Sequence, residues 1–572
     1  MDCREKILSE NYVDIIEESI LFENLQKNLK DFCVQRISDN ISNIYVNKNE
    51  VRDAFPNTEM YSVLPKCYAS LGGDATGIAS GNFNLQPLSE SGVFDLQNPP
   101  LNLTGRGIIL AIIDSGINYT DSLFRNADGT TRIRAIWDQS NQDGFSPPGF
   151  FYGSFFTSSD LNAALQTEMP MDYVNHFDKI GHGTMIAAIS GGRSFSDSFM
   201  YTSPAPDAEY IVVKLKEAKD QLKELYKIPT DVSCYEETDV LAALSFVRSF
   251  LETAGVPVVI CLGVGSSMGN RAGKSALETY ISELANSRNL AIVCGAGNQG
   301  NDRRHYEGVF QVGDVERKTV EFSVPPGVNG FFMEFWATEP AVFSLYLRSP
   351  SGEMTPLLDS KTQAPVTYSF LYGEGSVTAN YVLAENYTGW QAVYFRFDRP
   401  QEGIWSLLVT NDDKDVISKF HVWLPMEEFL KENVFFIQST PFVTMNAPAS
   451  ARGIITVSGY DSDNGGFYLQ SSRGYTSEDG KKPDFAAPAV DISTPFGARS
   501  GTETAAALTA GCVCQLMEWA VTNGNDRNVD GNKIRNYLLR GAARDPGLQY
   551  PNREWGYGTL DMEKTMERLA GI

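Results

Sequence analysis

The chain has 572 residues, too many for one ordinary hydrophobic core, and this length predicts two or three domains. Its hydrophobic content of 42% supports globular packing, and its net charge of −24 disfavours binding to nucleic acid or to an anionic membrane. The charged first six residues lead into no apolar signal-peptide core, and no apolar stretch approaches the ~18 residues of a membrane span. The eight cysteines are scattered, so we expect free, mostly buried thiols in a reducing compartment.

Residues 1–72 predict a small α+β unit of the ferredoxin-like type. The expected elements follow the order β-α-β-β-α-β and cover residues 11–16, 21–31, 32–46, 50–55 and 61–70. A glycine-rich stretch at 72–77 then predicts a flexible linker to the next domain.

Residues 80–312 alternate short apolar runs with helical patterns. The apolar runs, typical of strands buried on both faces of a parallel sheet, cover residues 107–114, 210–214, 257–263 and 290–295. Helical patterns lie between them, at 238–253 and 275–287. This alternation predicts a doubly wound α/β core, which resumes over residues 438–572 with another apolar run at 453–459.

Residues 313–425 separate the two α/β segments and have a different pattern. Alternating strands rich in aromatic residues, with Gly, Pro and Asp turns between them, are expected at 331–336, 342–347, 366–371, 390–396, 403–410 and 418–424. This pattern predicts an inserted all-β domain, an antiparallel sandwich of the jelly-roll type. We expect its large aromatic side chains in the sandwich core rather than on a sugar-binding platform; they are Trp336, Tyr346, Trp390 and Trp405.

Three short segments carry the positions of a Ser-His-Asp triad in the order acid, histidine, then Gly-Thr-X-x-Ala. Asp114 ends an apolar strand, where the acids of α/β sheets reach the ligand crevice. His182 lies in Gly-His-Gly-Thr, ahead of a run suited to a buried helix. Glu503 stands in Gly-Thr-Glu-Thr-Ala, where the nucleophile is expected. Taken singly, each motif has a structural explanation, such as a turn-forming aspartate or a packed histidine ring.

Asn298 follows a buried strand in the segment Gly-Ala-Gly-Asn-Gln-Gly. Its amide could donate to a developing oxyanion, a contact worth about 3 kcal/mol in enzymes of this kind, although Gly-Asn is also a common turn. The Cys-x-Cys pair formed by Cys512 and Cys514 is weak evidence for a metal. The sequence therefore predicts no metal site and no cofactor.

Together these motifs resemble those of the subtilisin-like serine proteases, over residues 100–310 and 440–570. Within that family the chain resembles the Csp germination proteases of spore-forming clostridia. This second resemblance depends on Leu-Thr-Gly-Arg-Gly at 103–107, on Arg304 and His305 after the Gly-Asn-Gln-Gly motif, and on the inserted sandwich.

The resemblance implies that residues 1–72 are a prodomain that acts as a folding chaperone. Active relatives cut the proform of a spore-cortex hydrolase when germination starts, and some members are described as pseudoproteases in germinant signalling. The resemblance also implies a location in the spore. The partners it implies are other Csp proteins, a cortex-hydrolase proform or a small-molecule germinant.

The resemblance assigns the acid to Asp114, the base to His182 and the oxyanion residue to Asn298, and it puts Glu503 at the nucleophile position. A carboxylate is a weak nucleophile toward an amide, and its attack would give an anhydride rather than an ester. Ala507 is a second departure, because the family usually has proline there. We therefore predict a pseudoprotease that acts as a binding or regulatory protein in spore germination.

Two rival functions remain open at this stage. The first is an active subtilisin-like endopeptidase with a displaced nucleophile, for which Thr502, Thr504 and Ser500 supply hydroxyls. Successive helical side chains diverge by about 100°, which disfavours both threonines, and Ser500 is more typical of a helix cap. The second rival is a glycan-binding function of the inserted sandwich.

Glu503 itself has two explanations. Its carboxylate, favoured at the start of a helix, could pair with protonated His182 and occupy the place of the oxyanion. Alternatively, it could be a solvated glutamate in a decayed site. The sequence does not decide between them.

Overall fold

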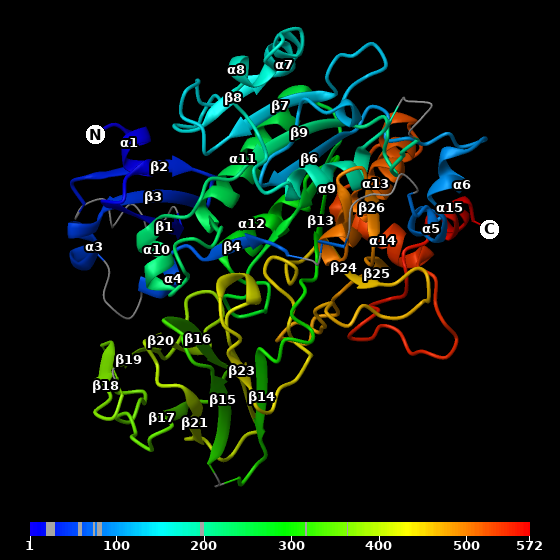
Figure 1. The fold of residues 1–572 in the computed structure, drawn as a ribbon. Coiled ribbons are helices and arrows are strands. Elements are labelled where there is room, and N and C mark those ends of the chain that lie inside the picture. The colour runs from blue at the N-terminus through cyan, green and yellow to red at the C-terminus, as the bar shows by residue number, and fades with distance from the viewer. Residues whose placement is uncertain are drawn as a thin grey trace.

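The computed structural model describes residues 1–18, 29–54, 60–72, 75–76, 83–194, 200–314, 317–362, 364–373 and 375–571. Figure 1 shows three parts: a small N-terminal unit, a central α/β domain and a β-sandwich below it.

The N-terminal unit is built on an antiparallel sheet in the order β1-β3-β2. Its strands are β1 (Tyr12–Glu18), β2 (Phe32–Arg36) and β3 (Ile41–Asn47), and its helices are α1 (Cys3–Leu8), α3 (Lys48–Ala54) and α4 (Met60–Val63). The predicted hairpin over 32–46 is confirmed. Most of the helix predicted over 21–31 lies outside the described residues.

The ferredoxin-like prediction is wrong for its last strand. Only β4 (Cys67–Ser70) is extended within the range predicted as a strand, 61–70, and it does not join β1–β3. It pairs instead with two strands of the α/β domain, β10 (Tyr235–Glu236) and β12 (Val264–Gly265). Backbone hydrogen-bonding groups must be satisfied somewhere, and β4 satisfies its own in the neighbouring domain.

The cysteines differ from the expectation in one respect. Cys3 in α1 and Cys33 in β2 form a disulfide, although 30 residues separate them. The fold brings the two together because α1 lies against the strands of the N-terminal sheet, and spacing alone carried no sign of this. The other six cysteines are free and buried, as predicted.

The α/β domain is organised around an eight-stranded sheet in the order β25-β24-β13-β11-β6-β9-β7-β8. All neighbours are parallel except β7 and β8. The strands are β6 (Ile109–Asp114), β7 (Ile133–Asp138), β8 (Ser154–Thr157), β9 (Glu209–Lys214), β11 (Val258–Leu262), β13 (Leu290–Gly295), β24 (Ile455–Tyr460) and β25 (Phe485–Pro488). The predicted doubly wound core is confirmed.

Helices cover both faces of this sheet (Figure 1). Alternate residues of β6 enter two separate cores: one contains α9 (His182–Gly191) and α13 (Thr502–Met517), and the other contains α11 (Glu237–Ala254) and α12 (Ala276–Leu284). The remaining helices are α5 (Gln86–Glu90), α6 (Val93–Gln97), α7 (Ser158–Leu165), α8 (Pro170–Tyr173), α10 (Asp220–Leu225), α14 (Gly531–Gly541) and α15 (Met562–Ala570). The small strands β5 (Ala75–Thr76), β26 (Ile492–Thr494) and β27 (Gly497–Arg499) form a separate sheet.

One helical stretch corrects the expectation about apolar segments. Thr502–Thr522, which is α13 and the π-helical turn after it, is long and apolar enough to cross a membrane by length and composition. However, 89% of its most apolar window is buried inside the protein. It is the central helix of a packed core.

The inserted domain consists of two antiparallel sheets that share one core. One sheet has the order β14-β22-β16-β20-β19-β18 and the other β17-β21-β15-β23. The strands are β14 (His305–Phe310), β15 (Lys318–Val324), β16 (Gly330–Ala337), β17 (Phe343–Arg348), β18 (Val366–Ser369), β19 (Ser376–Val382), β20 (Gln391–Asp398), β21 (Gly403–Asn411), β22 (Ser418–Trp423) and β23 (Phe435–Phe436). All six predicted strands are present, and β14, β15, β19 and β23 were missed. The jelly-roll topology stays a prediction.

The tryptophans of the insert are buried. Trp405 belongs to the core of the sandwich, whereas Trp336 and Trp390 pack in a cluster that joins the sandwich to the α/β domain. The prediction of a place in the sandwich core is therefore confirmed for Trp405 and wrong for Trp336 and Trp390, and Tyr346 is only partly buried. None of the three tryptophans offers an exposed ring for stacking on a sugar.

Candidate active site

Asp114 and His182 come together where β6 ends and α9 begins. Both side chains are buried, and Nδ1 of His182 lies 2.8 Å from Oδ2 of Asp114. The first turn of α9 packs tightly against the chain after β6, because a Cβ on Gly183 would lie 2.2 Å from the carbonyl oxygen of Gly116. The Gly-His-Gly motif therefore allows the imidazole to reach the aspartate, and this arrangement fixes the ring as in a triad.

Glu503 occupies the start of α13, as the sequence predicted, and only 1% of it is exposed. Nδ2 of Asn298 donates a hydrogen bond to Oε2 of Glu503 at 3.0 Å. The carboxylate lies directly over Gly501, where a Cβ would come within 2.1 Å of Oε1. Thr502 holds Asn298 in place, since its backbone N–H donates to Oδ1 of the asparagine at 3.0 Å.

The four predicted site residues thus converge, but Glu503 interacts with only one of them through a hydrogen bond. Its carboxylate takes the amide of Asn298, the group assigned to oxyanion stabilisation. Among the described residues, Oε1 of Glu503 and Nε2 of His182 have no hydrogen-bond partner. The hypothesis of a solvated glutamate is wrong. The other hypothesis was that Glu503 takes the place of the oxyanion and pairs with His182. The contact with Asn298 agrees with the first part, but no hydrogen bond links Glu503 to His182 in the described part of the chain.

Electrostatics nevertheless couples Glu503 and His182. Burial lowers the pKa of His182, but the charge and hydrogen bond of Asp114, with a smaller contribution from Glu503, outweigh it and raise that pKa above its ordinary value. Burial raises the pKa of Glu503 above its ordinary value, against the opposing effects of His182 and Asn298. The site favours a protonated imidazole and disfavours the carboxylate as an anion.

The hydroxyls near Glu503 are engaged elsewhere. Oγ1 of Thr502 accepts a hydrogen bond from the backbone N–H of Gly297 at 3.0 Å. Oγ1 of Thr504 donates to the carbonyl oxygen of Gly501 at 2.8 Å. Oγ of Ser500 accepts from the backbone N–H of Asp491 at 2.9 Å. None of these three forms a hydrogen bond with His182 in the described residues, so none stands as a displaced nucleophile.

The segment 67–72 crosses this site as an extended peptide. Its strand β4 lies antiparallel between β10 and β12, and the backbone N–H of Leu71 donates to the carbonyl oxygen of Gly263 at 3.2 Å. Oγ of Ser70 lies 3.3 Å from Oδ1 of Asp114. Nδ2 of Asn298 also donates to the carbonyl oxygen of Gly72, at 3.0 Å. The chain therefore holds its own backbone where a substrate would meet the triad. This pairing could not be predicted from the sequence, because β10 and β12 have two residues each and show no periodicity.

Comparison with models of known protein families identifies the family of this chain. The model of the subtilase family matches residues 105–323 and 436–558. The chain belongs to the subtilase family.

One solved structure shows the same architecture. The chain is similar to the CspB protease of Clostridium perfringens, with 26% identity and a TM-score of 0.74 over 86% of this chain and 100% of that one. It also matches the epidermin leader peptide processing serine protease of Staphylococcus aureus, with 13% identity and a TM-score of 0.47 over 97% and 99% of the two chains. A comparison with curated protein sequences gives no significant match. The predicted subtilisin-like fold of the Csp type is confirmed.

Proposed function

We propose that this subtilase is a Csp-type pseudoprotease that regulates spore germination by binding rather than by cleavage. The observation that carries the proposal is the buried carboxylate of Glu503 at the nucleophile position, hydrogen-bonded to Asn298. The carboxylate would have to form an anhydride to act as a nucleophile. The carboxylate also accepts the hydrogen bond of the Asn298 amide, which an oxyanion would need. This occupation supports the proposal that the chain has no peptidase activity.

The segment at the cleft supports the same function. Subtilases that carry a serine can cut their own N-terminal unit free, but this chain has no hydroxyl at position 503. In this proposal residues 1–72 are a retained prodomain, and β4 stays between β10 and β12. Partners then meet a protein whose cleft is already occupied. The partners we propose are another Csp-type protein or a cortex-hydrolase proform in the spore.

An active endopeptidase is the second candidate, because the Asp114–His182 pair is intact at 2.8 Å. It would need a nucleophile other than the hydroxyls of residues 500, 502 and 504, all of which bind elsewhere.

Two measurements together test the proposed function. The purified chain is incubated with a fluorophosphonate probe and with a cortex-hydrolase proform, next to a Csp-type protease that carries the serine as a positive control. We expect labelling and cleavage only in the control. In parallel, spores that lack the chain are compared with spores complemented by the wild-type chain, and we expect slower cortex hydrolysis only in the former. Labelling of the wild-type chain would favour the active endopeptidase, and normal germination without the chain would refute the regulatory role.

A further inference from the structure

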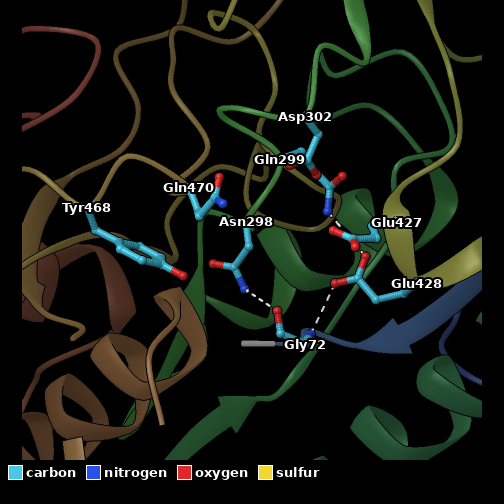
Figure 2. A pocket seen from close by; sticks show the side chains of 8 residues that line it. All are labelled: Gly72, Asn298, Gln299, Asp302, Glu427, Glu428, Tyr468 and Gln470. Carbon is cyan, nitrogen blue, oxygen red and sulfur yellow. Dashed lines mark hydrogen bonds between the residues drawn. The ribbon is translucent and has the colours of Figure 1, made fainter. Parts of the chain in front are cut away.

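A pocket of about 260 Å³ lies next to Asn298, outside the Asp114–His182 pair. Figure 2 shows Asp302, Glu427 and Glu428 on one side of Asn298 in the view, and Gln470 with Tyr468 on the other. The lining residues come from separate parts of the chain. They meet only in the folded protein, where the α/β domain contacts the segment after the sandwich.

The pocket contains buried acceptor atoms that lack donors. Gln299 is 4% exposed, and its Nε2 donates to Oε2 of Glu428 at 3.2 Å. Its Oε1, together with Oδ2 of Asp302 and Oε1 of Gln470, receives no hydrogen bond from any described residue. Folded proteins pair nearly all buried polar atoms. Three unpaired acceptors around one cavity therefore indicate a ligand that supplies donors.

The charges in and around the pocket indicate that this ligand is a cation. Three carboxyl groups line the cavity, and no lysine or arginine stands among the described lining residues. Arg304 is the cation that acts on Asp302; it is buried and donates through Nη1 to the carbonyl oxygen of Val434 at 2.7 Å. One guanidinium leaves an excess of negative charge in this region.

The titration of these carboxyl groups agrees with an unmet need for positive charge. Burial raises the pKa of Glu428 to about 7, even though the backbone N–H of Gly72 donates to it. Burial also raises the pKa of Asp302 to about 6, despite the charge of Arg304. Both anions would gain from a bound cation that also donates hydrogen bonds.

The geometry favours an organic cation over a metal ion. No group of three or more Asp, Glu, His or Cys side chains among the described residues lies close enough together to hold a metal. Two of the three unpaired oxygens belong to uncharged glutamine amides, and only the third, on Asp302, belongs to a carboxylate. An ammonium has three N–H donors and a guanidinium has five, and neither has an acceptor, so both match a wall of acceptors.

We propose that this pocket binds the ammonium or guanidinium group of a small organic cation. Oε1 of Gln299, Oδ2 of Asp302 and Oε1 of Gln470 accept its hydrogen bonds, and Glu427 and Glu428 balance its charge. A cavity of about 260 Å³ accommodates a small molecule, such as an alkylamine or the end of a lysine or arginine side chain. The proposal concerns a binding site, and it holds whether or not the regulatory role in germination does.

Isothermal titration calorimetry on the full chain tests the proposal. The probes are butylammonium and butylguanidinium chloride, with 1-butanol as a neutral match and KCl as an ionic-strength control. We expect saturable binding of at least one cation and none of butanol. Amide-blocked lysine and arginine distinguish a side chain of a peptide from a free amine as the source of the same group. If no cation binds, or if butanol binds as well, the proposal is wrong.

Variants locate the binding. Asp302→Asn removes one charge and Gln299→Leu removes one acceptor with little change of size, and we expect each to weaken binding at least tenfold. Glu563→Gln, an exposed acid on α15, is the matched control and leaves binding unchanged. Gln470→Leu, at a partly exposed position, serves if either of these variants fails to fold. Binding should also weaken as the pH falls from 8 to 5, because Glu428 and then Asp302 become protonated. Unchanged affinity in the folded variants would place the cation elsewhere and overturn the proposal.

Discussion

Replacing Glu503 with serine should raise the peptidase activity of this chain well above that of the wild type. The change removes the buried carboxylate and places a hydroxyl at the start of α13. It also releases Nδ2 of Asn298, which now donates to Glu503 at 3.0 Å, for an oxyanion. The general base requires no further substitution, because Nδ1 of His182 already lies 2.8 Å from Oδ2 of Asp114.

The size of the gain follows from what the site already contains. In subtilisin the loss of the serine alone lowers kcat on the order of 10⁶-fold, since the triad acts as a unit. A misplacement of about 1 Å can lower the rate by about 10²-fold, and residue 507 of α13 is alanine where the family usually has proline. We therefore expect a gain on the order of 10⁴-fold over the wild-type chain.

The same substitution should leave stability nearly unchanged. Loss of a buried carboxylate with an unpaired oxygen relieves roughly 1–3 kcal/mol, and loss of the hydrogen bond from Asn298 costs a similar amount. The free energy of unfolding should thus change by less than about 2 kcal/mol. A large loss of stability would invalidate the activity comparison, so thermal unfolding is measured first.

The assay uses two readouts. Fluorophosphonate labelling reports an activated serine, and intact mass reports self-cleavage next to Leu71 and Gly72, where the chain already crosses the site. Glu503→Ala, which has no hydroxyl, is the matched control, and Glu503→Ser combined with His182→Ala tests the need for the base. If Glu503→Ser folds like the wild type yet shows neither labelling nor cleavage, the remaining frame is not catalytic and our reasoning fails.

Three further outcomes are expected. Purified chain should keep its N-terminal unit, so intact mass should show no cut after 67–72; a uniform cut made without any added protease would contradict this. In Glu503→Gln the NMR titration midpoint of His182 should fall, because the carboxylate helps to raise that pKa. In the wild type, protonation of His182 stabilises the fold below about pH 6.5, and this stability is lost as the pH rises through the higher pKa of His182 in the folded state. Glu503→Gln should therefore shift this loss of stability to lower pH. An unchanged titration midpoint would exclude an electrostatic coupling between Glu503 and His182. Reduction should add two hydrogen atoms to the mass by opening the Cys3–Cys33 disulfide, and Cys3→Ser should lower the free energy of unfolding by about 2–4 kcal/mol; equal stability of that variant would contradict a structural role.

The parts of this fold that depend on regular periodicity were predictable from the sequence. The strands of the central sheet are buried on both faces, so each appears as an uninterrupted apolar run, as β6 does. Asp114 and His182 stand in motifs that are recognisable by their order along the chain and by the glycines around them. Their contact in the folded protein could therefore be predicted. The same holds for Asn298, which follows a buried strand.

The remaining features arise from contacts between segments far apart in the chain. Nothing local in residues 67–70 shows that β4 leaves its own sheet, because its partners are two short strands at 235–236 and 264–265. The buried state of Glu503 depends on the space above Gly501 and on Asn298, about 200 residues earlier. The pocket for which we propose cation binding combines the side chains of residues 299, 302, 427, 428 and 470, which form no sequence motif.

The position of β4 also has a consequence for solubility. Without β4, β10 and β12 would each present an open backbone edge. These edges would lie next to the apolar cluster that joins the sandwich to the α/β domain. Open strand edges recruit extended segments from other molecules and are a common origin of aggregation. By supplying the middle strand from within its own chain, the protein closes both edges at once. A subtilase that retained this strand would keep both edges closed to extended segments of other molecules.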